Sequence, residues 1–139
     1  TNDIYIGYRG TDLKNVSDLS ADTYIALGME DQSDRFKEAE ELYKRVKADH
    51  PNKKIHLSGH SLGGALASYV ACKHNVESLV TFNKGSNPLV DFKRDEKCKT
   101  EGEHYKTAYD PISTGVYFNK NVYIIPQIAR DPHTLLNFV

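Results

Sequence analysis

A serine flanked by two glycines is the residue of this chain best placed to do chemistry. Residues 59–63 read Gly-His-Ser-Leu-Gly, between a run typical of a strand and a run typical of a helix. A serine on so tight a turn needs small residues two positions away, because a Cβ on Gly59 or Gly63 would collide with the strand or the helix. The pattern predicts that the Ser61 hydroxyl points out of the sheet edge as a nucleophile, beside amides at the start of the helix. The alternative is a glycine-rich turn that only connects two elements.

A serine hydroxyl needs a base to become nucleophilic, and the base needs an acid to orient it. On this kind of strand–turn–helix the chain order is serine, then Asp or Glu, then histidine. Asp110 follows a strand-like run over residues 105–109 and precedes Pro111, which stops the strand, so Asp110 fits the acid. Taken alone, Asp110 could equally be a plain turn residue.

His133 is the histidine that fits the base. It lies late in the chain, after an Arg-Asp-Pro turn, and so follows both Ser61 and Asp110. Two other histidines come after Ser61. His74 falls near the end of the helix, where a polar residue favours the helix terminus, and His104 precedes the strand-like run, which would put it at the wrong end of the sheet. Without Ser61 and Asp110, His133 would be interpreted as a histidine in a surface turn.

Four segments of the chain resemble the class 3 (fungal-type) lipases of the α/β-hydrolase superfamily. They are residues 8–11 (Tyr-Arg-Gly-Thr), 59–67 (Gly-His-Ser-Leu-Gly-Gly-Ala-Leu-Ala), 110–112 (Asp-Pro-Ile) and 133–136 (His-Thr-Leu-Leu), and the resemblance runs from Ile4 to Phe138. The resemblance implies a minimal α/β-hydrolase fold with Ser61, Asp110 and His133 as its catalytic triad. It also implies that the backbone amides of Thr11 and Leu62 form the oxyanion hole.

Two segments depart from the pattern of that family. After Thr81-Phe82 the chain reads Asn-Lys-Gly-Ser-Asn-Pro, where the family usually carries a Gly-x-Pro-Arg stretch, and this alters a loop near the site. The region 12–33, where a lid would be rooted, is short and polar. We therefore expect short or medium acyl esters, rather than bulk triglyceride, as substrates.

Length and composition fit one soluble globular domain. With 139 residues, 39% of them hydrophobic and 27% charged, a single compact domain over residues 1–139 is expected. A net charge of -1 gives no electrostatic case for nucleic acid or an anionic membrane surface as a partner. No apolar stretch approaches the length of a transmembrane span, and no signal peptide is visible. The chain begins at Thr1 rather than Met, so the sequence leaves open whether another segment precedes it. It also leaves open the cellular location and the oligomeric state.

The two cysteines, Cys72 and Cys98, are expected to be free thiols. Cys72 falls in the helix after the turn and Cys98 in a charged loop, and nothing in the sequence requires a disulfide between them. No Cys-x-x-Cys pair supports a metal site, so the sequence predicts neither a metal nor a cofactor.

Strands that alternate with helices predict a mostly parallel sheet of about five strands with helices on both faces. Residues 34–49 form the first clear helix, because apolar residues recur there at helical spacing and a proline follows. Strands are expected at residues 4–8, 55–58, 78–82, 105–109 and 121–125, and residues 89–100 stay ambiguous between a short helix and a loop.

These features together favour a serine hydrolase that cleaves carboxylic, lipid-type esters through an acyl-enzyme intermediate. Two alternatives stay open. A lipase-like domain without activity could serve as a binding or scaffold module, since a fold does not imply its function. An acyltransferase or a thioesterase would use the same triad with a different acceptor or leaving group.

Overall fold

The architecture comes from a computed structural model of the chain. The structure describes residues 2–9, 33–85, 98–107, 121–130 and 134–138. Three of the predicted site residues, Thr11, Asp110 and His133, lie outside these ranges, as does nearly all of the region 12–33.

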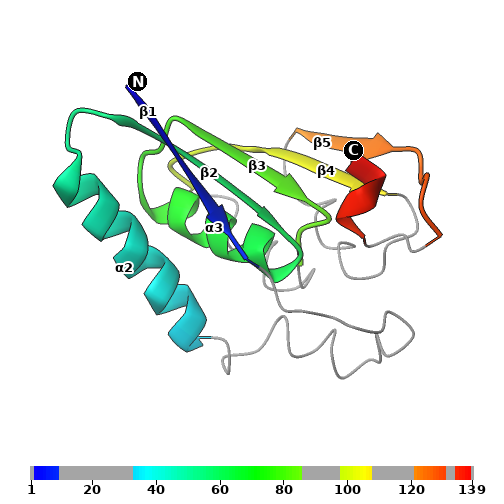
Figure 1. Ribbon diagram of the computed structural model, residues 1–139, viewed down its shortest axis with the longest axis horizontal. Coiled ribbons are helices and arrows are strands. Elements are labelled where there is room, and N and C mark those ends of the chain that lie inside the picture. Colours follow the sequence, from blue (N-terminus) through cyan, green and yellow to red (C-terminus); the bar gives the residue numbers. More distant parts are fainter. Residues whose placement is uncertain (1, 10–32, 86–97, 108–120, 131–133, 139) are drawn as a thin grey trace.

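Within the described residues, five parallel strands form one sheet, and their order across the sheet is their order in the chain (Figure 1). The strands are β1 (Asp3–Tyr8), β2 (Lys54–His60), β3 (Ser78–Phe82), β4 (Glu103–Thr107) and β5 (Val122–Ile125). The predicted α/β architecture, a mostly parallel sheet of about five strands, is confirmed. Strand β4 begins at Glu103 rather than at Tyr105, so the prediction that His104 precedes this strand was wrong.

In the part of the chain that the structure describes, two helices cover one face of the sheet. Helix α3 (Leu62–Lys73) packs against β1, β2 and β3, and helix α2 (Ser33–Asp49) packs against α3. Apolar residues from alternate strand positions meet the two helices to form the core, with members Ile6, Tyr8, Ala39, Tyr43, Ile55, Leu57, Leu62, Leu66, Ala67, Val70, Ala71 and Leu79. This alternation follows from the period of two in a strand, which sends every second side chain to the same face.

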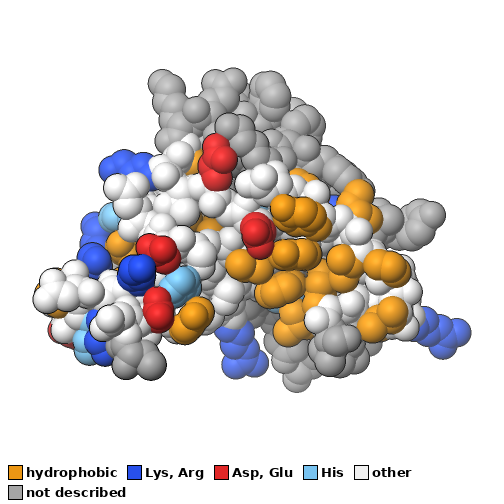
Figure 2. All heavy atoms as spheres, turned by 90° about the horizontal axis from the view of Figure 1, so that it is seen from above, with side chains coloured by type: hydrophobic (Ala, Val, Ile, Leu, Met, Phe, Trp, Pro, Cys, Tyr) orange, Lys and Arg blue, Asp and Glu red, His pale blue; other side chains and the backbone are white. Residues whose placement is uncertain are grey.

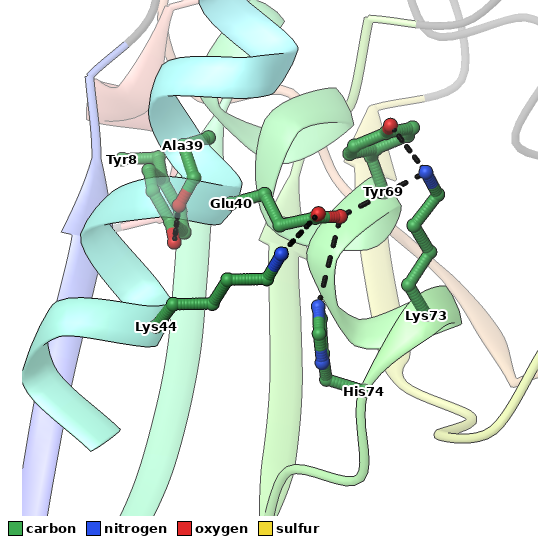
Figure 3. Close-up of polar contacts among 7 residues, drawn as sticks. All are labelled: Tyr8, Ala39, Glu40, Lys44, Tyr69, Lys73 and His74. Carbon is green, nitrogen blue, oxygen red and sulfur yellow. Dashed lines mark hydrogen bonds and ion pairs between the residues drawn. The ribbon is translucent and has the colours of Figure 1, made fainter. Parts of the chain in front are cut away.

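Polar contacts hold α2 against β1 and α3 (Figure 3). The Tyr8 hydroxyl on β1 donates to the carbonyl of Ala39 at 2.9 Å, and burial raises the pKa of this phenol. The Glu40 carboxylate lies 3.2 Å from Lys44 Nζ, 3.8 Å from Lys73 Nζ and 3.6 Å from His74 Nε2. The hydrogen bond from Lys44, with the charge of Lys73, lowers the pKa of Glu40.

Aromatic rings line the opposite face of the sheet along β3, β4 and β5. The rings of Phe82 and Tyr105 stack at 5.9 Å and those of Tyr105 and Tyr123 at 5.2 Å, while Phe138 meets Phe82 edge-on at 5.1 Å. Phe138 belongs to the short 3-10 helix η5 (Leu135–Phe138), so helical elements contact both faces of the sheet. Figure 2, seen from above relative to Figure 1, shows hydrophobic side chains gathered on the side where β4 and β5 lie.

A disulfide joins Cys72 to Cys98, so the expectation of two free thiols was wrong. The segment that leads into β4 runs along the end of α3, where Lys99 N donates to Cys72 O at 3.1 Å and Thr100 N donates to Ala71 O at 3.2 Å. The fold therefore brings together two cysteines that stand 26 residues apart in the chain. The spacing of the two cysteines in the sequence does not indicate that they lie next to each other.

Candidate active site

Ser61 is the single residue between β2, which ends at His60, and α3, which begins at Leu62. Its backbone has φ 59° and ψ -126°, and the residue is 2% exposed. A non-glycine residue with positive φ carries strain of about 1–3 kcal/mol, which its surroundings must hold in place. A sharp, strained turn from strand to helix is the geometry that presents a nucleophilic serine at the top of an α/β sheet.

Two glycines make this turn possible. A Cβ on Gly59 would lie 2.1 Å from the carbonyl oxygen of Gly63, and a Cβ on Gly63 would lie 2.0 Å from the carbonyl oxygen of Tyr8. Both obstacles are backbone atoms, which cannot rotate away as a side chain could. Glycine at these two positions therefore lets β2, the turn and the end of β1 approach one another closely.

The last residue of β3 and the segment that follows it hold both peptide groups of Ser61. The Ser61 amide donates to Phe82 O at 3.2 Å, and the Gly85 amide donates to Ser61 O at 2.8 Å. The first amides of α3 also bond to this carbonyl, from Gly64 at 3.0 Å and from Ala65 at 3.3 Å. These bonds explain how the strained conformation of Ser61 is maintained.

Leu62 is the first residue of α3 and is fully buried. The first amides of a helix have no acceptor within it and carry the positive end of the helix dipole, so the Leu62 amide is a candidate donor next to Ser61. Gly63 packs against the end of β1, from which the chain continues toward Thr11. The carboxyl ends of parallel strands share one edge of the sheet, so β1, β2 and β4 all lead to the edge that carries Ser61.

A buried polar cluster next to this edge was missed by sequence reasoning. His104 on β4 is 4% exposed, and its Nδ1 lies 2.7 Å from Thr81 Oγ1 on β3. Burial, with the nearby Lys84 ammonium, lowers the pKa of His104 to about 3, so the imidazole is neutral and bonded within the core. Lys84 and Lys106 are also buried, and Lys106 Nζ donates to Thr107 O at 2.6 Å. No pattern in the sequence distinguishes these side chains from surface residues.

A second serine, histidine and aspartate meet at the other end of the strands. His56 Nδ1 lies 2.7 Å from Ser78 Oγ, and His56 Nε2 lies 2.9 Å from Asp3 Oδ1. The three side chains join β1, β2 and β3, and the Tyr5 ring stacks on His56 at 4.6 Å. Ser78 is the first residue of β3 and has no helix beginning beside it, so it lacks the amides that stand next to Ser61. The arrangement ties the strands together rather than forming a second nucleophilic centre.

Within the described ranges no group of three or more His, Cys, Asp or Glu side chains could hold a metal ion. His56 and His60 stand four residues apart, but they lie in a strand, where that separation spans roughly 13 Å. No helix in the described part of the chain is long and apolar enough to cross a membrane.

In the described part of the chain, a parallel five-stranded sheet with a serine at a strained strand–helix turn forms an α/β architecture. A family model described as a Tle-like phospholipase domain matches residues 1–96. This is more than half of the 139 residues, and the chain belongs to that phospholipase-like family. The match includes Thr11, Ser61 and Leu62 but ends before Asp110 and His133.

One curated relative is a protein of Eremothecium gossypii named "Putative lipase ATG15", which is 50% identical over 52 residues. These residues are 37% of this chain and 9% of that protein, so the chain spans only a small part of this relative. No solved structure matches the chain. These two matches support the prediction of a lipase-like family, and neither of them is to a class 3 lipase model.

Proposed function

We propose that this chain is a serine hydrolase of the class 3 lipase type that cleaves carboxylic, lipid-type esters. The observation that carries the proposal is the strained, buried Ser61 at the start of α3, with the amide of Leu62 beside it. Membership of a phospholipase-like family supports a lipid ester as substrate. The predicted acid and base, Asp110 and His133, are assigned from chain order and from resemblance.

In the proposed reaction Ser61 Oγ attacks the ester carbonyl carbon while His133 removes the hydroxyl proton. Asp110 orients His133 and stabilises its cation. The amides of Leu62 and Thr11 bind the oxyanion of the tetrahedral intermediate, and losing one such donor typically lowers turnover ~100- to 1000-fold. The alcohol leaves with the proton from His133, and a water molecule that His133 activates then hydrolyses the acyl-enzyme. The scheme needs neither a metal nor a cofactor.

The acyl esters of phospholipids are the first lipid class to test, because the family is described as phospholipase-like. We expect short or medium acyl chains to be preferred, since the region 12–33 is short and polar. Turnover of emulsified long-chain oil well above turnover of a soluble ester would contradict this preference.

The decisive experiment is hydrolysis of p-nitrophenyl esters from acetate to palmitate, with the wild type beside Ser61→Ala. The matched control is Ser68→Ala, in the same helix, whose buried hydroxyl has no hydrogen-bond partner in the described part of the chain. We expect Ser68→Ala to keep activity and Ser61→Ala to lose it, together with labelling by a fluorophosphonate probe. A folded wild type with no turnover and no labelling would refute the proposal.

The other two triad assignments have their own test. His133→Ala and Asp110→Ala should each lose most activity while circular dichroism shows that they stay folded. Full activity in either variant would remove that residue from the triad without affecting the assignment of Ser61.

A further inference from the structure

Asn83, the first residue after β3, is fully buried and has φ 44°. A non-glycine residue rarely adopts positive φ, although Asn tolerates it better than most residues do. A buried carboxamide must also find hydrogen-bond partners, because leaving it unpaired is costly. Both features mark a residue whose conformation is held for a reason.

The contacts of Asn83 lead to the end of β4, the strand beside β3 (Figure 1). Its backbone amide donates to Tyr105 O at 2.8 Å. Its Oδ1 accepts from the Thr107 amide at 2.9 Å and lies 3.5 Å from Thr107 Oγ1. The paired residues of β3 and β4 end at Phe82 and Tyr105. The carboxamide of Asn83 extends this hydrogen bonding to Thr107, the last residue of β4.

The residues on either side of Asn83 hold the proposed nucleophile. Phe82 O accepts from the Ser61 amide at 3.2 Å, and the Gly85 amide donates to Ser61 O at 2.8 Å. A Cβ on Gly85 would lie 3.3 Å from the Ser61 carbonyl, so this segment passes close to the turn. Four consecutive residues, 82–85, therefore connect Ser61 to Thr107.

We infer that Asn83 is a positioning residue for the proposed hydrolysis. It fixes the end of β4, from which the chain runs on to Asp110, relative to Ser61. This inference rests on the proposed function, since it assumes that Asp110 orients the base. Misplacing catalytic groups by about 1 Å can lower turnover ~100-fold, so losing the carboxamide should act on kcat.

Substitution of Asn83 by two different residues separates its backbone role from its side-chain role. Asn83→Gly can keep the positive φ but removes the acceptor for Thr107. Asn83→Asp keeps an acceptor oxygen at the same place. The matched control is Asn121→Gly, because Asn121 also has positive φ, 57°, and its side chain donates to Gly102 O at 3.3 Å, at the opposite end of β4.

The measurements are kcat, KM and the pH profile of kcat/KM on a p-nitrophenyl ester, with a thermal midpoint for each variant. We expect Asn83→Gly to lower kcat by about 30- to 100-fold with KM changed less than about twofold. The acidic limb of the profile should move to lower pH, because an imidazole farther from its carboxylate has a lower pKa. Asn83→Asp should recover much of kcat, and Asn121→Gly should stay within about twofold of the wild type.

Each result decides the inference. Wild-type kcat in a folded Asn83→Gly overturns it, as does a fall in the thermal midpoint with kcat unchanged, and the proposed function survives both. A wild type without Ser61-dependent turnover overturns the proposed function and this inference together. If Asn83→Gly does not fold, Asn83→Ser takes its place, since its short hydroxyl cannot reach Thr107 as the carboxamide does, and kcat equal to that of the wild type again overturns the inference.

Discussion

Gly63→Ala offers a direct test of the close approach between β1 and the turn that carries Ser61. The added Cβ would lie 2.0 Å from Tyr8 O, whereas ordinary contact begins at 3.4 Å, so the two backbone segments would have to separate by about 1.4 Å. Overpacking of this kind typically costs 1–3 kcal/mol and occasionally more. Because both sides are backbone, we expect about 3 kcal/mol, together with the loss of fluorophosphonate labelling at Ser61.

Gly7→Ala is the matched control for Gly63→Ala, since it adds the same methyl group to β1 itself. Its Cβ would lie 3.9 Å from Ser58 Oγ, which is ordinary contact, and glycine is a poor strand residue. We expect Gly7→Ala to be neutral or to stabilise by about 0.4–1 kcal/mol. Urea unfolding of both variants gives the two free energies. If Gly63→Ala matches Gly7→Ala in stability and labelling, the reasoning about the turn is refuted.

Three further predictions concern the disulfide, the α2–α3 contact and the strain at the turn. Reducing the Cys72–Cys98 bond, which closes a loop of 26 residues, should lower the unfolding free energy by about 3.5 kcal/mol in the chain-entropy model; equal thermal midpoints with and without reductant would contradict this. Glu40→Gln should destabilise by about 0.5–1 kcal/mol at neutral pH. Since the pKa of Glu40 is lowered in the fold, that difference should be present above about pH 4.5 and vanish as the pH falls through the lowered pKa; a difference independent of pH in urea unfolding would exclude the ion pairs as its cause. Ser61→Gly should abolish activity yet raise the unfolding free energy by about 1 kcal/mol relative to Ser61→Ala, because glycine accepts the positive φ; a less stable glycine variant would argue against strain.

The parts of the fold that could be predicted from the sequence are those determined by local signals. Helix α2 was predicted because its apolar residues recur at helical spacing and a proline follows it. The turn at Ser61 was predicted because its glycines, strand and helix are contiguous. The start of β4 was placed two residues too late, since Glu103 and His104 have low strand propensity and their place in the strand comes from pairing with β3 and β5.

The features that sequence reasoning missed are contacts between residues far apart in the chain. The contact between Asn83 and Thr107, the His104–Thr81 bond and the Cys72–Cys98 disulfide each join residues more than twenty positions apart. Register decides the two contacts between β3 and β4, and a single sequence does not reveal register. The departure from the family pattern after Thr81-Phe82 was visible, but its meaning required the bonds that the structure gives to Asn83.

The strain at Ser61 bears on the choice between an enzyme and a binding module. At a position with φ 59°, glycine would be less costly for stability than serine. Here the strained serine is held by the end of β3, by the first amides of α3 and by two glycines whose Cβ positions are blocked by backbone. Strain that several elements maintain around one hydroxyl favours a role for that hydroxyl in chemistry, because stability alone would favour its replacement.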